Sequence, residues 1–180
     1  MLKDRFDRLS LAALVLIVAA LGALLATARP SDGRQANVGT DRRLEQELMT
    51  QAKLAFLERQ YGPVIELRRQ GELQSALLKL EELDRKYPGE AHGALLRGDI
   101  LYRMGLIDRS VVSLATAVRG NGDYLDKASP LSQRDLVATV VEQGVPLLRD
   151  RLRTQPEDRQ ATATLKDAYY LQSRLAGVCE

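Results

Sequence analysis

The chain has 180 residues with a formal net charge of +2, and 28% of its residues are charged, with both signs interspersed. This balance predicts neither a nucleic-acid-binding surface nor a funnel for acidic substrates. Aromatic residues make up only 4% of the chain and tryptophan is absent, which argues against base-stacking platforms.

The chain contains one cysteine, Cys179, and one histidine, His92. A single thiol cannot form an intramolecular disulfide, so Cys179 is expected to be solvent-exposed, with an intermolecular disulfide as the alternative. Zinc sites need several Cys or His ligands, and c-type haem attachment needs a C-x-x-C-H motif. The sequence therefore predicts no metal site and no cofactor.

Residues 9–28 form an apolar run, LSLAALVLIVAALGALLATA, without a single charge. A helix of this length rises about 30 Å, the thickness of a bilayer's hydrocarbon core, and it satisfies its own backbone groups in lipid. We therefore expect a transmembrane anchor here. The short basic tail, residues 1–8, is expected to stay in the cytoplasm, so the following domain would face the periplasm of a bacterium.

A cleaved signal peptide is the alternative for this segment. Basic residues precede the apolar run, and Ala26, Thr27 and Ala28 fit a small-x-small cleavage site. Two observations speak against cleavage: Asp4 and Asp7 lie in the leader, and the run exceeds the usual length of about 7–15 residues. If cleavage did occur, the product would be a secreted protein.

Residues 29–40 lack apolar periodicity and contain Pro, Ser, Asp, Gly and Asn, a composition typical of a linker. A helix is expected over 41–60, capped by Thr40 or Asp41. Its apolar residues recur at four-residue steps: Leu44, Leu48, Ala52 and Phe56. The Gly62-Pro63 pair is expected to break or kink this helix, because proline has no N–H to donate.

Every later segment has the apolar period of an amphipathic helix, and no alternating strand pattern occurs. Residues 41–177 are therefore expected to form an all-α domain, followed by a tail at 178–180. The expected helices lie within residues 69–88, 91–105 and 106–118. A further helix should start at Ser129 and Pro130 and bend at Gly144 and Pro146, and the last should run from Pro156 to Gly177.

Residues of the same kind recur at a step of 34. Gly71 and Gly105 have this spacing, and so do the leucines at 67 and 101. Two longer series share the step: Leu80, Leu114 and Leu148, and Pro88, Gly122 and Pro156. A fixed period of this length is typical of stacked helix pairs.

On these residues the chain resembles the tetratricopeptide repeat family, whose pattern includes A-x3-F and a closing proline. The first copy, residues 57–90, matches with Ala76-x3-Leu80, Gly71 and Pro88. The second copy, residues 91–124, matches with Gly98, Gly105, Leu114, Ala117 and Gly122. Residues 125–158 are a degenerate third copy, and Tyr169 falls in the last helix. The resemblance implies an α-α superhelix of about three helix pairs with a C-terminal capping helix. Pro63 and Ser110 depart from the pattern. The alternative is a generic helical bundle.

No combination of residues points to catalysis. The chain contains no G-x-x-x-x-G-K-[ST] loop and no H-E-x-x-H motif. Nucleophilic catalysis needs a nucleophile beside its base, and no such arrangement is recognisable. The sequence therefore predicts no catalytic residue, no small-molecule substrate and no enzymatic activity.

In the family that the chain resembles, the first helix of each pair lines a concave groove that holds a peptide or helix of a partner. The resemblance therefore implies a set of groove residues, several of which are tyrosines and arginine, the residue types that anchor interfaces. By position, the expected lining is Tyr61, Ile65 and Arg68, then His92, Leu95, Asp99 and Tyr102, then Gln133 and Leu136, and finally Tyr170.

These features predict a module that binds other proteins. Our first hypothesis is a scaffolding or assembly factor in the bacterial inner membrane that assists a cell-envelope complex. The second is a small structural subunit whose apolar helix packs permanently against other membrane helices. Only a slight close-packing site, Leu21-Gly22-Ala23, supports the second hypothesis.

Overall fold

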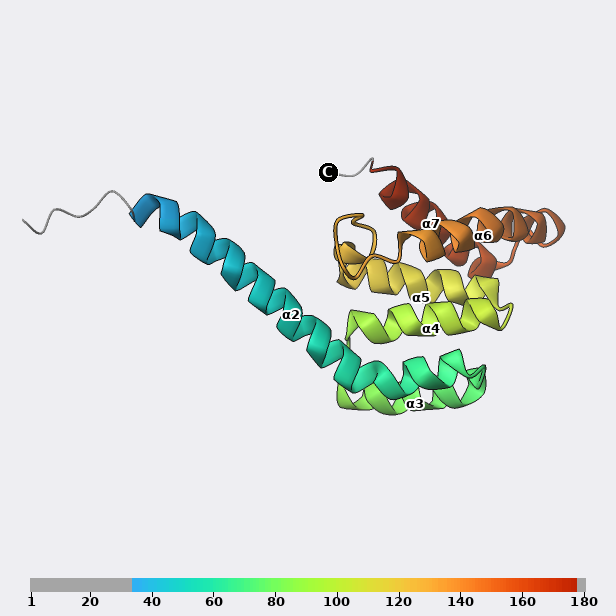
Figure 1. Cartoon of the computed structure of the whole chain (residues 1–180). Helices are drawn as coiled ribbons and strands as arrows, with labels where there is room; N and C mark the ends of the chain where they lie inside the picture. Colours follow the sequence, from blue (N-terminus) through green and yellow to red (C-terminus); the bar gives the residue numbers. More distant parts are fainter. Residues whose placement is uncertain (1–33, 178–180) are drawn as a thin grey trace, which may run out of the picture. The chain divides into compact units, whose positions relative to one another are not determined.

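A computed structural model describes residues 34–177 of the chain (Figure 1). The expected cytoplasmic tail, the anchor at 9–28, the start of the linker and the C-terminal tail with Cys179 lie outside these residues. Within residues 34–177, none of the helices combines the length and the apolar composition that crossing a bilayer requires. The chain divides into two compact units, one up to Ala52 and one from Lys53 onward.

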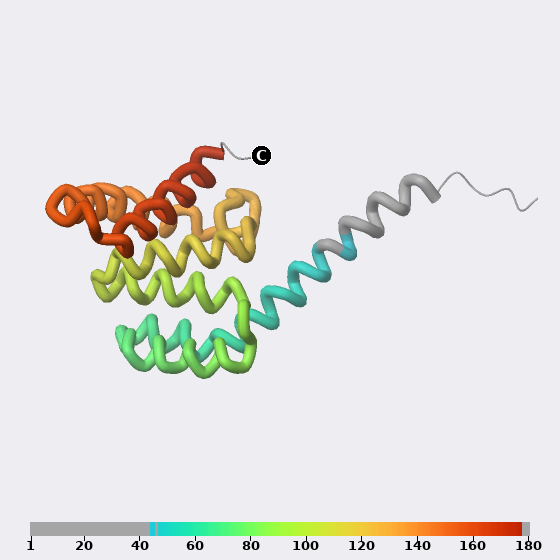
Figure 2. The backbone as a smooth tube through the Cα atoms, turned by 180° about the vertical axis from the view of Figure 1, so that it is seen from behind, coloured from blue at the N-terminus to red at the C-terminus, as the bar shows by residue number. Residues whose placement is uncertain are grey.

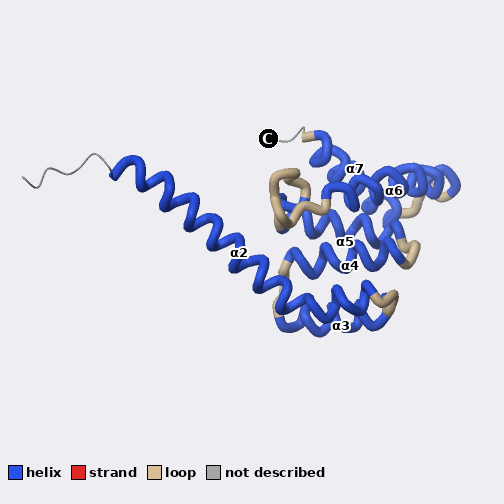
Figure 3. Tube along the Cα trace, viewed as in Figure 1, coloured by secondary structure: helices blue, strands red, loops and turns tan. Residues whose placement is uncertain are grey.

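The described part of the chain contains helices joined by loops and no strand, so the predicted all-α class is confirmed for it (Figure 3). A single 3-10 turn, η1 (Gly122–Tyr124), accompanies the α-helices. Those helices are α2 (Arg34–Arg69), α3 (Leu73–Lys86), α4 (Ala91–Arg103), α5 (Ile107–Gly120), α6 (Arg134–Thr154) and α7 (Arg159–Ala176).

The first unit, as far as it is described, is the beginning of α2. This helix already starts at Arg34, so residues 34–40 of the predicted linker are helical. No proline interrupts the chain between Arg34 and Pro63, and a single glycine in a helix costs only about 1 kcal/mol. The predicted apolar side chains of this unit are exposed: Leu44 by 56% and Leu48 by 57%.

In the second unit, α2 continues through Pro63 to Arg69, so of the two predicted outcomes, a break or a kink, the break does not occur. Proline removes one backbone hydrogen bond from a helix, and packing on its two sides can offset that loss. Tyr61 and Val64 flank the proline, and both are fully buried.

Helix α2 is joined to α3, and α4 to α5, by turns of the same geometry. Gly71 and Gly105 adopt φ of 83° and 77°. After each glycine, the next N–H donates to a carbonyl five residues back, from Glu72 to Leu67 and from Leu106 to Leu101, both at 2.9 Å. This is the Schellman stop of a helix, and it recurs at the step of 34 residues that the sequence shows.

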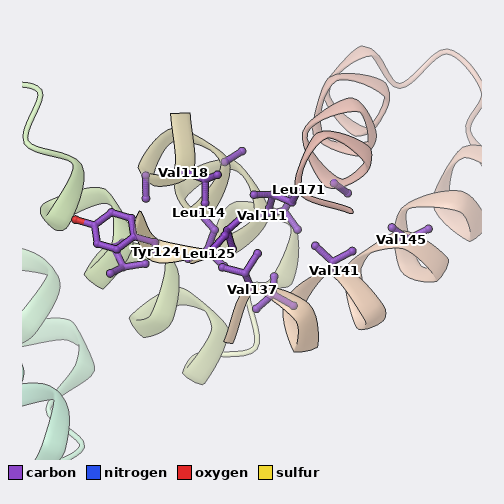
Figure 4. Close-up of a cluster of buried hydrophobic side chains, with 14 of the residues drawn as sticks. Val111, Leu114, Val118, Tyr124, Leu125, Val137, Val141, Val145 and Leu171 are labelled. Carbon is purple, nitrogen blue, oxygen red and sulfur yellow. The ribbon is translucent and has the colours of Figure 1, made fainter. Parts of the chain in front are cut away.

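Helices α3, α4 and α5 lie in successive rows (Figures 1 and 2). The architecture of the second unit is thus that of a helical repeat. The first core cluster joins the end of α2 to α3 and α4, with Leu57, Tyr61, Val64, Ala76, Leu80, Leu83, Leu96 and Ile100 buried. The second core joins α5, α6 and α7, and Figure 4 shows Val111, Leu114, Val137, Val141 and Leu171 gathered in it.

Helices α4 and α5 approach each other closely at Gly98. A Cβ added at Gly98 would lie 2.6 Å from Cγ of Leu114 and 3.3 Å from its backbone nitrogen. Ser110, which stands where the repeat pattern has alanine, is fully buried, and its Oγ donates a 2.7 Å hydrogen bond to the Gly98 carbonyl oxygen. The departure at Ser110 therefore does not leave an unsatisfied buried hydroxyl.

The third copy is not a helix pair. Residues 121–133 form the 3-10 turn and an irregular segment, and α6 begins at Arg134 rather than at Pro130. The hydroxyl of Ser129 accepts from the N–H of Leu131 at 3.1 Å, within a turn. Burial of Tyr124 and Leu125 holds this segment against the helices, and the expected helix starts later, as α6.

The last two helices pack on α5 and on each other. Helix α6 runs without interruption through Gly144 and Pro146. A Cβ at Gly144 would lie 3.0 Å from Val111, so this glycine permits a close crossing of α6 and α5. Helix α7 starts at Arg159, not Pro156, because Asp158 is its N-cap and accepts from the N–H of Ala161 at 2.9 Å. Its predicted end at Gly177 is confirmed, with φ of 72°.

We predict that Gly98→Ala destabilises the protein by about 1–3 kcal/mol, because the added methyl group would force Leu114 and its backbone to move. Gly122→Ala is the matched control. Its Cβ would meet only an arginine side chain at 3.6 Å, an ordinary contact, so its effect should stay within about 0.5 kcal/mol. Urea denaturation followed by circular dichroism measures both. Equal stability of the two variants would contradict the close α4–α5 packing.

Candidate protein-binding face

Seven of the ten residues that the sequence places in a groove come from the end of α2 and from α4, which run side by side. Two contacts fix their register. The rings of Tyr61 and His92 meet edge to face with centroids 5.0 Å apart, and the guanidinium of Arg68 donates to the carboxylate of Asp99. Both contacts join residues 31 positions apart, so the two helix segments are parallel.

A third ring extends this contact. The ring centroid of Tyr124 lies 6.2 Å from that of His92, and the Tyr124 hydroxyl lies 3.5 Å from Nδ1, the outer limit of a hydrogen bond. Figure 4 shows this hydroxyl turned away from the aliphatic cluster that the ring borders. We call Tyr61, His92 and Tyr124 the ring row. The end of α2, the start of α4 and η1 each contribute one ring to it.

Burial changes the ionisation of all three rings. Burial is the main cause that lowers the pKa of His92 to about 4; Arg68 and Lys53 lower it further, and Glu90 opposes them. Burial also raises the pKa of Tyr61 and of Tyr124 to about 12. At neutral pH the ring row is therefore uncharged. The Tyr61 hydroxyl lies beside the Gly93 backbone without a hydrogen bond of ordinary geometry.

Next to the ring row lies a buried carboxylate held by two arginines. Asp99 is 6% exposed; Arg68 donates to one of its oxygens and Arg103 to the other, at 3.0 Å. Since a buried carboxylate without partners would be strongly destabilising, this pairing accounts for its place in the fold. The cluster carries one more positive than negative charge. Arg103, 53% exposed, presents that surplus to solvent.

Three of the expected groove residues are too deeply buried to contact a partner. Tyr61 is 1% exposed, Leu95 is 4% exposed and Asp99 is 6% exposed. These side chains instead join the helices to each other. The remaining residues of α2 and α4 in the set, Ile65, Arg68, His92 and Tyr102, are partly exposed. The Tyr102 hydroxyl accepts a 3.0 Å hydrogen bond from Gln143 of α6.

Gln133 and Leu136 belong to a separate hollow of about 520 Å³ at the start of α6. Arg134, also in its wall, donates to the carbonyl oxygens of Leu125 and Leu175 and so ties the irregular segment to the end of α7. Tyr170 lies elsewhere, with the Arg119 guanidinium 4.6 Å from its ring centroid. Tyr170, Tyr102 and Leu136 all pack against the second core cluster.

Sequence reasoning missed Tyr124 and Arg103. Tyr124 falls outside every predicted helix, and only its spacing of 32 residues from His92, close to the 31 between His92 and Tyr61, could have indicated it. Arg103 follows Asp99 by four residues on one helix, a spacing that favours an ion pair. In residues 34–177, no three His, Cys, Asp or Glu side chains gather closely enough to hold a metal ion.

No model of a known protein family matches the chain, and no curated protein matches it.

We predict that His92 titrates with a midpoint near 4 in the folded protein, against an ordinary value of about 6.5. Between these values the unfolded chain binds more protons at this site than the folded chain. The resulting stability is therefore complete above about pH 6.5 and is lost as the pH falls toward 4, by about 2–3 kcal/mol. Because His92 is the only histidine, its ring resonances in an NMR titration give the midpoint directly.

His92→Gln is the control for this titration. Carboxylates contribute equally to both proteins, so the variant should lose less stability than the parent between pH 7 and pH 4.5. A midpoint near 6.5, or the same pH dependence in both proteins, would show that the ring row does not exclude water from His92.

Proposed function

We propose that this chain is a membrane-anchored module of the tetratricopeptide type that binds other proteins and assists the assembly of a cell-envelope complex. One observation carries the proposal. The Schellman turns at Gly71 and Gly105 repeat their hydrogen bonds at the 34-residue step. The leucines of the same step, Leu80, Leu114 and Leu148, are each fully buried. Stacked helix pairs of this kind present extended surfaces for recognition.

The partner would contact the partly exposed side chains between α2 and α4. Ile65 and Tyr102 offer apolar contact, while Arg68 and Arg103 offer guanidinium groups already held in place by Asp99. Tyrosine and arginine anchor many interfaces because they bury a large area and still make directed polar contacts. A rigid surface of this sort loses little conformational freedom when a peptide or a helix binds.

Membrane attachment is proposed from residues 9–28, which are long enough and apolar enough to span a bilayer. In this proposal the N-terminus lies in the cytoplasm and the helical domain lies in the periplasm, attached to the bacterial inner membrane. Two alternatives use the same domain. The chain could be a small structural subunit of a membrane complex, or a secreted protein released by signal cleavage.

Site-specific photo-crosslinking in intact membranes tests the proposed face. A photoreactive residue in place of Ile65 or Tyr102 should crosslink to another protein, and Arg68→Ala should reduce the yield about tenfold, because a central interface arginine contributes more than about 1 kcal/mol. The control position is Arg153, whose side chain is 83% exposed at the end of α6. Equal products from Arg153 and from the proposed face would contradict a specific site.

A further inference from the structure

A second hollow lies on the side of the repeat formed by α3, α4, α5 and α7. It has a volume of about 350 Å³, within the range of pockets that take a ligand or an anchoring side chain. Each of the four helices contributes to its wall: Leu77 and Glu81, Arg97 and Leu101, Asp108, Arg109, Val112 and Ser113, and Gln160 and Thr164. We call it the four-helix hollow.

The apolar part of the four-helix hollow consists of Leu77, Leu101 and Val112. Val112 is 38% exposed and stands among the few large apolar side chains of α3 to α7 that are open to water. Leu101 is buried beneath, at 7% exposure. An aliphatic side chain entering this hollow would remove apolar surface on both sides from water, which stabilises a complex.

The charged side chains of the hollow differ in whether they are paired. Arg97 donates to Asp84, and Asp108 lies 3.8 Å from Arg151. By contrast, the side chains of Glu81 and Arg109 make no hydrogen bond or ion pair anywhere in residues 34–177. They come from different helices, α3 and α5. One unpaired acid and one unpaired base therefore border a single apolar patch.

We infer that the four-helix hollow docks an amphipathic helical segment of another protein. An aliphatic residue of that segment would insert against Leu77 and Val112, an acidic residue would pair with Arg109, and a basic residue would pair with Glu81. Residues three or four apart on a helix share one face, so a single helix can present all three groups together. The hollow lies apart from the ring row, because Arg97 and Leu101 take a different face of α4 from His92 and Asp99.

Photo-crosslinking of the full chain in its native membrane tests this inference. A photoreactive residue replaces Val112, and mass spectrometry maps the segment to which it crosslinks. The expected segment has an aliphatic residue with an acidic and a basic residue within about one helical turn on either side. Arg109→Glu and Glu81→Lys should each lower the crosslink yield about tenfold.

Arg59→Glu and Glu142→Lys are the matched controls, since both residues are exposed and neither lines the hollow. They should leave the yield unchanged. The inference is overturned if the mapped segment lacks the aliphatic residue or either charge, if the yield ignores both charge reversals, or if Val112 gives no protein crosslink. If a photoreactive residue at Tyr102 still crosslinks to another protein in any of these cases, the proposed function stands although this inference fails. Failure of the inference and failure of the proposed function are therefore distinguishable.

Discussion

The arrangement of α4 against α5 depends on the absence of a side chain at Gly98. Leu114 occupies the space that a Cβ would need, and Ser110 uses the same approach to reach the Gly98 carbonyl oxygen. A close approach of this kind fixes the rotation of α4, because any other face would bring a larger side chain against α5. Once that rotation is fixed, His92 and Asp99 face α2, while Arg97 and Leu101 face the four-helix hollow.

Helix α4 therefore connects two surfaces with different chemistry. On one side it contributes to an uncharged ring row and to a buried carboxylate between two arginines. On the other side it forms part of an apolar hollow bordered by one unpaired acid and one unpaired base. A partner at one surface need not compete with a partner at the other, which is a useful property for a scaffold.

The sequence predicts α3, α4 and α5 well because their boundaries carry local chemistry. Glycine at 71 and 105 has the left-handed conformation that ends a helix, and apolar residues follow the helical period between these stops. Helix α2 continues through Pro63 and α6 through Pro146, so neither proline ends its helix, because packing of buried neighbours can offset the lost backbone hydrogen bond. The path of residues 121–133 could not be predicted from the local sequence, because it depends on tertiary contacts of the buried side chains Tyr124 and Leu125.

The candidate face was predicted only in part, for a related reason. Family position identifies which residues belong to the first helix of a pair, but it does not distinguish a side chain that meets a partner from one that joins two helices. Tyr61, Leu95 and Asp99 belong to the second kind. Their burial depends on the distance to neighbouring helices, whose residues lie far away in the sequence.

Amide hydrogen exchange at equivalent turns is the most direct test that a helix pair is repeated at a step of 34 residues. The N–H groups of Glu72 and Leu106 occupy the same place in two turns 34 residues apart, and so do those of Ala76 and Ser110 at the start of the following helices. All four are hydrogen-bonded, so all four should exchange far more slowly than in an unfolded chain, with similar protection within each pair. Protection at one turn and free exchange at the other would contradict a repeated helix pair.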